Sequence, residues 1–142
     1  MEEILLEFIG TLDASWKKWQ AQVGDGAGIS KLTIHQLNYI DAVNMLGNPT
    51  ITELARQLHI TKASVTTAIN KLVMLGFVTK SQSSEDRRVF YVHLTPAAEQ
   101  LVAAKYRALQ AYGELIRNVL SEEEVGQFRA ILTKLISHFK HA

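Results

Sequence analysis

The chain has 142 residues, 47% of them hydrophobic, and carries 15 Lys and Arg residues against 14 Asp and Glu residues, so one domain with a buried core is expected. The absence of cysteine excludes disulfides, thiolate nucleophiles and cysteine-based zinc sites. No stretch approaches the roughly 20 apolar residues of a membrane helix, and no apolar segment near Met1 resembles a secretory signal. We therefore expect a soluble, cytoplasmic single domain, residues 1–142, with no membrane association.

The first 50 residues predict two helices. From Glu2 to about Val23, apolar residues recur at three- and four-residue steps, as in an amphipathic helix. Residues 24–28 contain three glycines in five and predict a loop. Thr33 and Gln36 then match a capping box that opens a second helix, which Gly47-Asn48-Pro49 ends. Its buried stripe is expected to be Leu37, Ile40, Val43 and Leu46.

Residues 50–76 predict a helix-turn-helix. Thr50 and Glu53 repeat the capping-box pattern, and Thr61 is placed to cap a fourth helix running to about Leu75. The third helix can therefore last only two turns. Its inward residues are expected to be Ile51, Leu54, Ala55 and Leu58. Two capped helices separated by a short turn are typical of DNA-binding proteins.

A β-hairpin and two long helices are expected to follow. Residues 77–80 and 89–94 are rich in β-branched and aromatic residues, and the polar residues 81–88 between them predict an exposed tip. Thr95-Pro96 launches one long helix, and Ser121 caps a last one. The expected fold is mainly α with a small β-hairpin wing: a winged helix-turn-helix lobe, residues 31–94, and a helical dimerisation region, residues 1–30 and 95–142.

The outer helices carry more apolar surface than one lobe can cover. Residues 1–23 and 95–140 hold long apolar stripes, whereas a winged helix of about 60 residues offers little surface on which to bury them. Packing against a second copy would bury these stripes. We therefore expect a homodimer whose interface is built from the first helix and the last two helices.

Charge is distributed unevenly along the chain. Residues 56–93 contain six cations and two anions, a balance of +4, while the whole chain carries only +1. The residues outside this segment therefore carry a net charge of −3. Positive potential on one segment suits a protein that touches phosphates through a single face.

The fourth helix has two different faces. At 100° per residue, Val65, Ala68, Ile69 and Leu72 fall on one side, and Ala63, Thr67, Asn70 and Met74 on the other. Short side chains on the outward face allow close approach to a major groove, and Ser, Thr and Asn can reach base edges. A solvated surface helix would more usually carry Glu and Lys there.

The expected hairpin tip carries Glu85-Asp86-Arg87-Arg88. Asp86 is two residues from Arg88 and is placed to accept its hydrogen bonds, which would hold the guanidinium away from the loop. Narrow minor grooves attract such an arginine. Arg87 would then face the DNA backbone. An ordinary exposed ion pair is the simpler interpretation of these charges, but their position beside a helix-turn-helix favours the minor-groove role.

These pieces together resemble the MarR (multiple antibiotic resistance regulator) family of transcriptional regulators. The matching residues are Leu32-Thr33 and Gln36, Thr52-Glu53-Leu54-Ala55, Val65-Thr66 with Leu72 and Gly76, Asp86-Arg87-Arg88, and Leu94-Thr95. One departure is Ser83-Ser84-Glu85, which stands in place of the family's frequent Asp-Pro at the wing.

The resemblance implies a homodimeric winged-helix regulator, expected to act as a repressor, that binds double-stranded DNA at a pseudo-palindromic operator without a cofactor. Its recognition-helix contacts would fall on Lys62, Ser64, Thr66, Thr67, Asn70 and Lys71, and its wing arginine on Arg88. A small-molecule effector is a further expectation, with a candidate pocket at Trp16, Trp19, His35 and Tyr39. For the two Trp residues, simple packing in the dimer core is the alternative.

Other functions are less consistent with the sequence. Enzyme motifs such as a phosphate loop, G-x-S-x-G or His-Glu-x-x-His do not occur, so no catalytic activity is expected. A metal-responsive regulator would need a histidine and carboxylate cluster, whereas His35 faces no histidine in the expected fifth helix, so no metal site is predicted. A winged helix used only for protein contacts stays an alternative, and a strong salt dependence of DNA affinity would exclude it.

Overall fold

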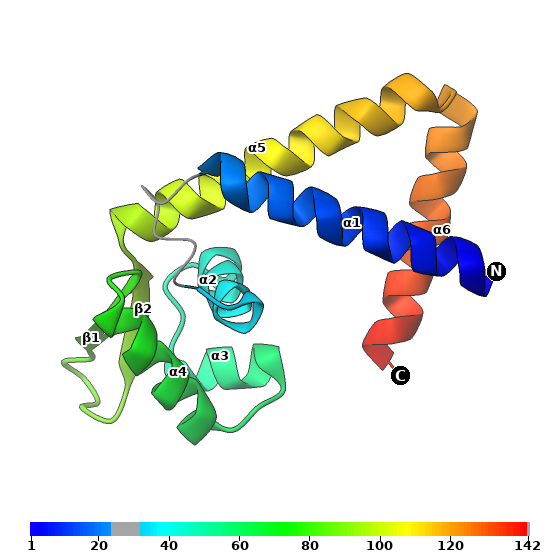
Figure 1. The fold of residues 1–142 in the computed structure, drawn as a ribbon. Helices are drawn as coiled ribbons and strands as arrows, with labels where there is room; N and C mark the ends of the chain where they lie inside the picture. The colour runs from blue at the N-terminus through cyan, green and yellow to red at the C-terminus, as the bar shows by residue number, and fades with distance from the viewer. Residues whose placement is uncertain (24–31, 142) are drawn as a thin grey trace. The chain divides into compact units, whose positions relative to one another are not determined.

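The computed structural model describes residues 1–23 and 32–141, and confirms a mainly helical fold with one antiparallel hairpin (Figure 1). The helices are α1 (Glu2–Val23), α2 (Ile34–Leu46), α3 (Ile51–Leu58), α4 (Lys62–Met74), α5 (Pro96–Val119) and α6 (Glu122–His141). The strands are β1 (Val78–Gln82) and β2 (Phe90–Leu94). The predicted glycine-rich loop at residues 24–28 lies outside the described residues. The chain divides into two compact units, residues 1–105 and 106–142.

The first turns of α2, α3 and α4 are capped by the threonines that the sequence indicated. The hydroxyl of Thr33 accepts from the Gln36 N–H at 3.1 Å, while the Gln36 side chain accepts from the Thr33 N–H at 2.9 Å. Thr50 and Glu53 form the same reciprocal pair at 3.1 and 2.8 Å. These caps satisfy N–H groups that the helices leave without partners, so they fix where each helix begins.

The ends of these helices use left-handed backbone conformations. Gly47 ends α2 with φ +66°, and Gly76 follows α4 with φ +83°. His59 ends α3 with φ +55° although it has a side chain. The glycine positions were predicted, since glycine adopts such angles without steric cost. The conformation of His59 was not predicted, because nothing in its residue type favours it strongly.

The core of the winged helix-turn-helix lobe lies where α2, α3, α4 and the hairpin meet. Fully or almost fully buried side chains come from each of these elements: Leu37, Ile40, Val43, Leu54, Val65, Ile69, Leu72, Val78 and Val92. The prediction that Leu46 is buried was wrong, since 37% of its surface is exposed. Leu46 is the last residue of α2, and the chain turns away at Gly47 before any element can cover it.

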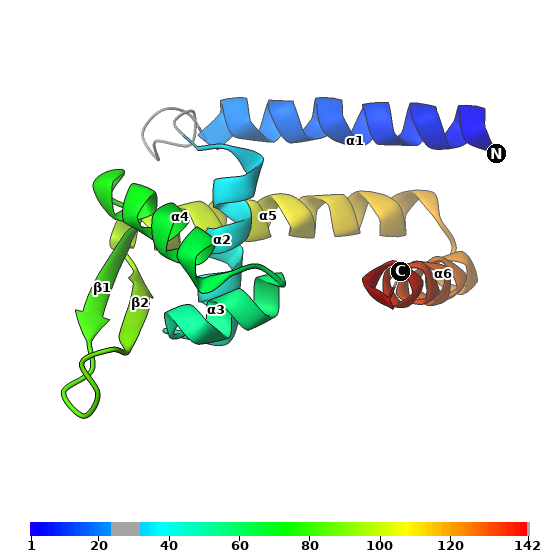
Figure 2. The ribbon, with the colours of Figure 1, turned by 90° about the horizontal axis from the view of Figure 1, so that it is seen from below.

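The first strand extends two residues further towards the tip than predicted, and the hairpin is joined to the helices. Its register pairs Val78 with Leu94 and Gln82 with Phe90, so the tip comprises residues 83–89 rather than 81–88. The Val92 N–H donates to the Pro49 carbonyl at 2.8 Å, which anchors β2 to the segment between α2 and α3. Figure 2 shows the hairpin projecting from the lobe with its tip at the outer end.

The outer helices expose many apolar side chains. On α1, Leu5, Phe8, Ile9 and Leu12 are 49–55% exposed. On α6, apolar residues are also exposed: Ile131, Leu132, Leu135, Ile136 and Phe139. Within the described residues, no helix combines the length and the apolar character needed to cross a membrane.

Candidate nucleic-acid interface

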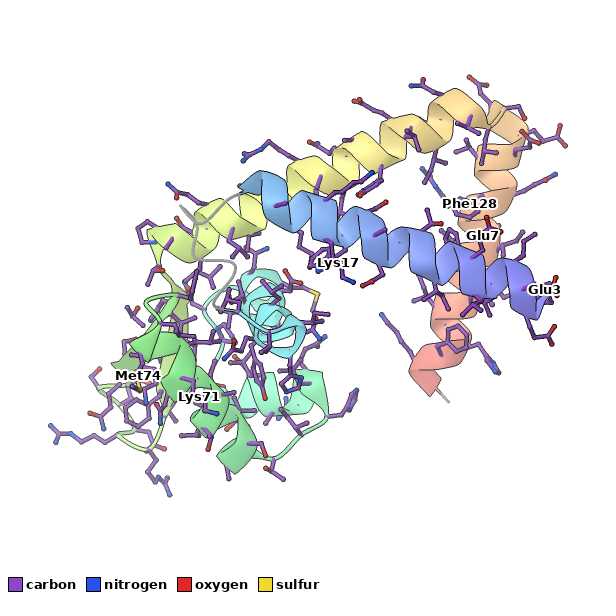
Figure 3. All side chains as sticks on the ribbon, viewed as in Figure 1. Glu3, Glu7, Lys17, Lys71, Met74 and Phe128 are labelled. Carbon is purple, nitrogen blue, oxygen red and sulfur yellow. The ribbon has the colours of Figure 1, made fainter. Side chains whose placement is uncertain are left out.

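Helix α4 separates its core side chains from its predicted DNA contacts. Val65, Ile69 and Leu72 are fully buried. All the predicted contact residues on this helix are exposed: Lys62, Ser64, Thr66, Thr67, Asn70 and Lys71. Met74 is 88% exposed, and both Lys71 and Met74 project from the helix (Figure 3). The exposed side therefore offers short polar groups, cations and one flexible apolar side chain.

Hydrogen bonds within α4 determine what its hydroxyls can offer. The hydroxyls of Thr66 and Thr67 donate to the carbonyls of Lys62 and Ala63 at 2.9 and 3.1 Å. Their oxygens therefore keep lone pairs with which to accept hydrogen bonds. The Ser64 oxygen instead accepts from the Thr61 hydroxyl at 2.9 Å, which leaves its own proton available for donation. The helix can thus present both acceptors and a donor to base edges.

A contact that the sequence did not reveal joins α4 to the hairpin. The Lys80 Nζ on β1 donates to the Asn70 Oδ1 at 2.7 Å. The same ammonium lies 5.4 Å from the centre of the Phe90 ring, a distance suited to a cation–π contact. Lys80 entered the sequence argument only as part of the positive charge, and the structure adds it to the candidate interface.

The predicted contact between Asp86 and Arg88 is present at the wing tip. The Asp86 Oδ1 accepts from the Arg88 backbone N–H at 3.0 Å and from its Nε at 3.1 Å, and the Asp86 Oδ2 accepts from an Arg88 terminal nitrogen at 3.1 Å. These side-chain and backbone hydrogen bonds from Arg88 hold the pKa of Asp86 below its usual range, and the pairing raises the pKa of Arg88. The guanidinium is braced while its side chain stays 88% exposed.

Local hydrogen bonds also organise the rest of the wing tip. The Ser83 hydroxyl accepts from the N–H groups of Glu85 and Asp86, each at 3.3 Å. The Gln82 side chain donates to the Arg87 carbonyl at 2.6 Å, while the Arg87 side chain stays exposed. Ser83 therefore forms a serine-type turn at the position where proteins of the MarR family frequently have Asp-Pro.

The structure brings part of the predicted effector pocket together. The rings of His35 and Tyr39 pack edge to face, with their centres 5.2 Å apart. Both residues line a cavity of about 530 Å³ between the start of α2 and α4. Its α4 wall is formed by Ala63, Ser64, Thr67, Ala68 and Lys71. Tyr39 is almost wholly buried, and this burial raises the pKa of its phenol.

Trp16 does not line this cavity, and its place in an effector pocket stays a prediction. The Lys105 ammonium lies 5.7 Å from the centre of the Trp16 ring. The same ammonium forms an ion pair with Asp41. The cavity beside α4 is lined by other residues. Helical spacing placed Trp16 on the inner side of α1, but it did not specify which element of the fold it would meet. The side chain of Trp19 lies outside the described part of the structure.

Residues 32–90, which make up most of this lobe, match the model of the MarR family. This part of the chain is a MarR-type winged helix. Among proteins with curated descriptions, it is 34% identical over 95 residues to the transcriptional regulator AdcR of Streptococcus pneumoniae, covering 64% of each chain. It is 30% identical over 93 residues to the HTH-type transcriptional regulator YwhA of Bacillus subtilis, covering 63% of this chain and 64% of that protein. The matched region thus spans under two thirds of these relatives' length.

Solved structures show the same fold over nearly the whole chain. The FabT protein of Streptococcus pneumoniae, crystallised in complex with DNA, has a TM-score of 0.80 at 23% identity, with 99% of each chain covered. A mutant of Staphylococcus aureus MepR, bound to an oligodeoxyribonucleotide, has a TM-score of 0.63 at 20% identity, with 98% of each chain covered. At these identities the likeness establishes the MarR fold of this chain.

The candidate interface therefore has two parts, the exposed side of α4 and the wing tip. Sequence reasoning identified both, together with the Asp86–Arg88 pair. It missed Lys80 and the side chains of Thr33, Gln36 and Ala63 that line the cavity. Within the described residues, no group of three or more His, Cys, Asp or Glu side chains is arranged to hold a metal.

Proposed function

We propose that this chain is a sequence-specific DNA-binding transcriptional regulator, acting as a repressor in the cytoplasm. Helix α4 enters the major groove, and the wing places Arg88 in the adjacent minor groove. One observation carries this proposal: α4 exposes short polar side chains between Lys62 and Lys71, on the same lobe as a wing arginine braced by Asp86. The fold of the DNA-bound MarR-type structures supports it.

The proposed roles of the individual residues in DNA binding follow from the chemistry of their side chains. Lys62, Lys71 and Arg87 contact phosphates, which position the protein without reading sequence. Ser64, Thr66, Thr67 and Asn70 contact base edges and give specificity. No catalytic group is needed for this function.

The proposed functional unit is a homodimer. The apolar side chains exposed on α1 and α6 would be buried by a second copy, and large exposed apolar patches commonly mark such interfaces. Two copies related by twofold symmetry read two half-sites about one helical turn, roughly 34 Å, apart. A pseudo-palindromic operator follows from this symmetry.

A titration of the full chain against the DNA upstream of its own gene tests the proposal. Fluorescence anisotropy at 50 and 200 mM salt, with an unrelated duplex of equal length as control, measures both specificity and charge dependence. We expect specific binding that falls by about 10³- to 10⁵-fold between these salt concentrations if six to ten phosphates are contacted. Equal binding to both duplexes would overturn specific recognition, and weak salt dependence would favour a protein-interaction module.

The cavity between α2 and α4 supports a second proposal, regulation by a small-molecule effector. A ligand there would contact Ser64, Thr67 and Lys71, so it would compete with DNA for the same helix. A fragment library screened by ligand-observed NMR, with and without operator DNA, tests this proposal. Fragments that DNA displaces, and that the variant His35→Trp no longer binds, are expected. Fragments that bind equally well in the presence of operator would contradict it.

A further inference from the structure

The side chain of Lys80 is held between the wing and the recognition helix. Its strand neighbour across the hairpin is Val92, which is fully buried, so Lys80 lies on the sheet face that meets the core. The ammonium lies 5.4 Å from the Phe90 ring centre and 2.7 Å from Asn70. Because two separate contacts hold one flexible side chain, its position relative to α4 is defined.

This contact fixes the orientation of the Asn70 amide. Lysine carries only donors, so the amide atom that faces its ammonium must be the carbonyl oxygen. The amide nitrogen therefore lies on the other side and remains a donor. In many asparagines the two orientations are interchangeable, but a neighbouring cation removes this ambiguity here.

An asparagine with both amide atoms available is suited to adenine. Its oxygen accepts from the adenine N6 amino group while its nitrogen donates to N7. In this protein the oxygen already accepts from Lys80, and the positive charge disfavours the approach of another amino group. Guanine instead presents two acceptors, O6 and N7, at its major-groove edge. The Asn70 amide nitrogen and the Lys80 ammonium are both donors, so each can donate to one of these acceptors.

We propose that Lys80 sets the base preference of Asn70, changing an adenine-reading position into one that reads guanine. This inference rests on the DNA-binding function proposed above. Lys80 lies on β1, whereas Asn70, the side chain whose base preference it determines, lies on α4. A good bidentate contact of this kind separates the correct base from a wrong one by roughly 5- to 150-fold.

Selection from a random duplex library tests the proposal with the full chain and the variants Lys80→Met and Lys80→Gln. Methionine keeps an unbranched apolar stem beside Phe90 but removes the charge. The unsubstituted protein is expected to enrich guanine at one position in each half-site, and both variants are expected to shift that position towards adenine. Asn70→Ala should remove the preference at the same position.

The matched control is Lys71→Met, which removes a lysine from α4 itself. It is expected to weaken binding to all sequences while leaving the selected base at every position unchanged, because a phosphate contact carries no sequence information. If Lys80→Met and Lys80→Gln select the same base as the unsubstituted protein, Lys80 has no role in specificity. If the unsubstituted protein enriches no sequence at all, the proposed function itself fails.

Discussion

The carboxylate of Asp86 accepts hydrogen bonds from both the backbone N–H and the guanidinium of Arg88. A carboxylate that binds the Nε and a terminal nitrogen fixes the plane of the guanidinium as well as its position. The other guanidinium N–H groups remain directed outward from an 88% exposed side chain. The wing therefore presents its arginine in a defined orientation before any DNA is bound.

Replacing Arg88 with Ala is expected to weaken operator binding by roughly 5- to 150-fold, the usual effect of losing one specific contact. The melting temperature should change little, because the side chain is exposed and its ion pair with Asp86 lies at the surface. Anisotropy titration and thermal unfolding measure the two effects. Arg87→Ala is the matched control and should weaken specific and unrelated DNA alike. An Arg88→Ala protein that binds the operator normally would refute the minor-groove role.

The Asp86 carboxyl should titrate below its ordinary pKa of 3.8, since hydrogen bonds from Arg88 favour its charged form. Because the folded-state pKa is lowered, the contact stabilises the wing above the unfolded pKa and is lost as the pH falls through the folded pKa. Carboxyl NMR titration of the intact protein measures this value. In the Arg88→Ala variant the midpoint should rise towards 3.8, and the same midpoint in both proteins would argue against the pairing in solution.

Removing the cap of α3 is expected to destabilise the lobe. Thr50→Ala eliminates the oxygen that accepts from the Glu53 N–H at 3.1 Å, and loss of such a cap typically costs about 1 kcal/mol. Urea unfolding followed by circular dichroism measures the change in the free energy of unfolding. Thr50→Ser keeps the hydroxyl and should retain most of the stability. Equal destabilisation by both substitutions would mean that packing, and not capping, is responsible.

The proposed dimer predicts that a charge on the apolar side of α6 separates the subunits. Leu135→Glu places a carboxylate at a position whose side chain is 45% exposed in the single chain and would be buried by a second copy. Sedimentation velocity should show a dimer for the unsubstituted protein and a monomer for this variant. Lys134→Glu, at an exposed neighbouring position, should remain dimeric. A monomeric unsubstituted protein would overturn the proposal.

Local features of this fold were predictable because their determinants lie within a few residues. The capping pairs Thr33–Gln36 and Thr50–Glu53, and the Asp86–Arg88 contact, each join residues two or three positions apart. In contrast, the contact of Lys80 with Asn70 depends on the strand register and on how the hairpin meets α4. Neither quantity could be predicted from the residues alone, since the tip was expected to begin two residues earlier than Ser83.

The same distinction applies to the predicted pocket. His35 and Tyr39 share a helix and lie one turn apart, so helical spacing alone places them together. Trp16 belongs to another helix, and the ammonium that lies over its ring comes from Lys105, far along the chain. The prediction that Leu46 is buried was wrong for a related reason. Periodicity identifies which side of a helix faces the core. It does not show how far along the helix other elements cover that side.

The hydrogen bond from the Ser83 N–H to the Val89 carbonyl, 2.9 Å long, closes the tip next to the last paired residues of the two strands. Below it, β2 is anchored by the Pro49 carbonyl, so the base of the hairpin does not depend on the residues beyond the closure. We therefore expect that loops of other lengths and sequences can be inserted between these two residues without altering the helices. If the wing contacts the flanking minor groove as proposed, such exchanges would change the flanking preference of the operator separately from its central half-sites.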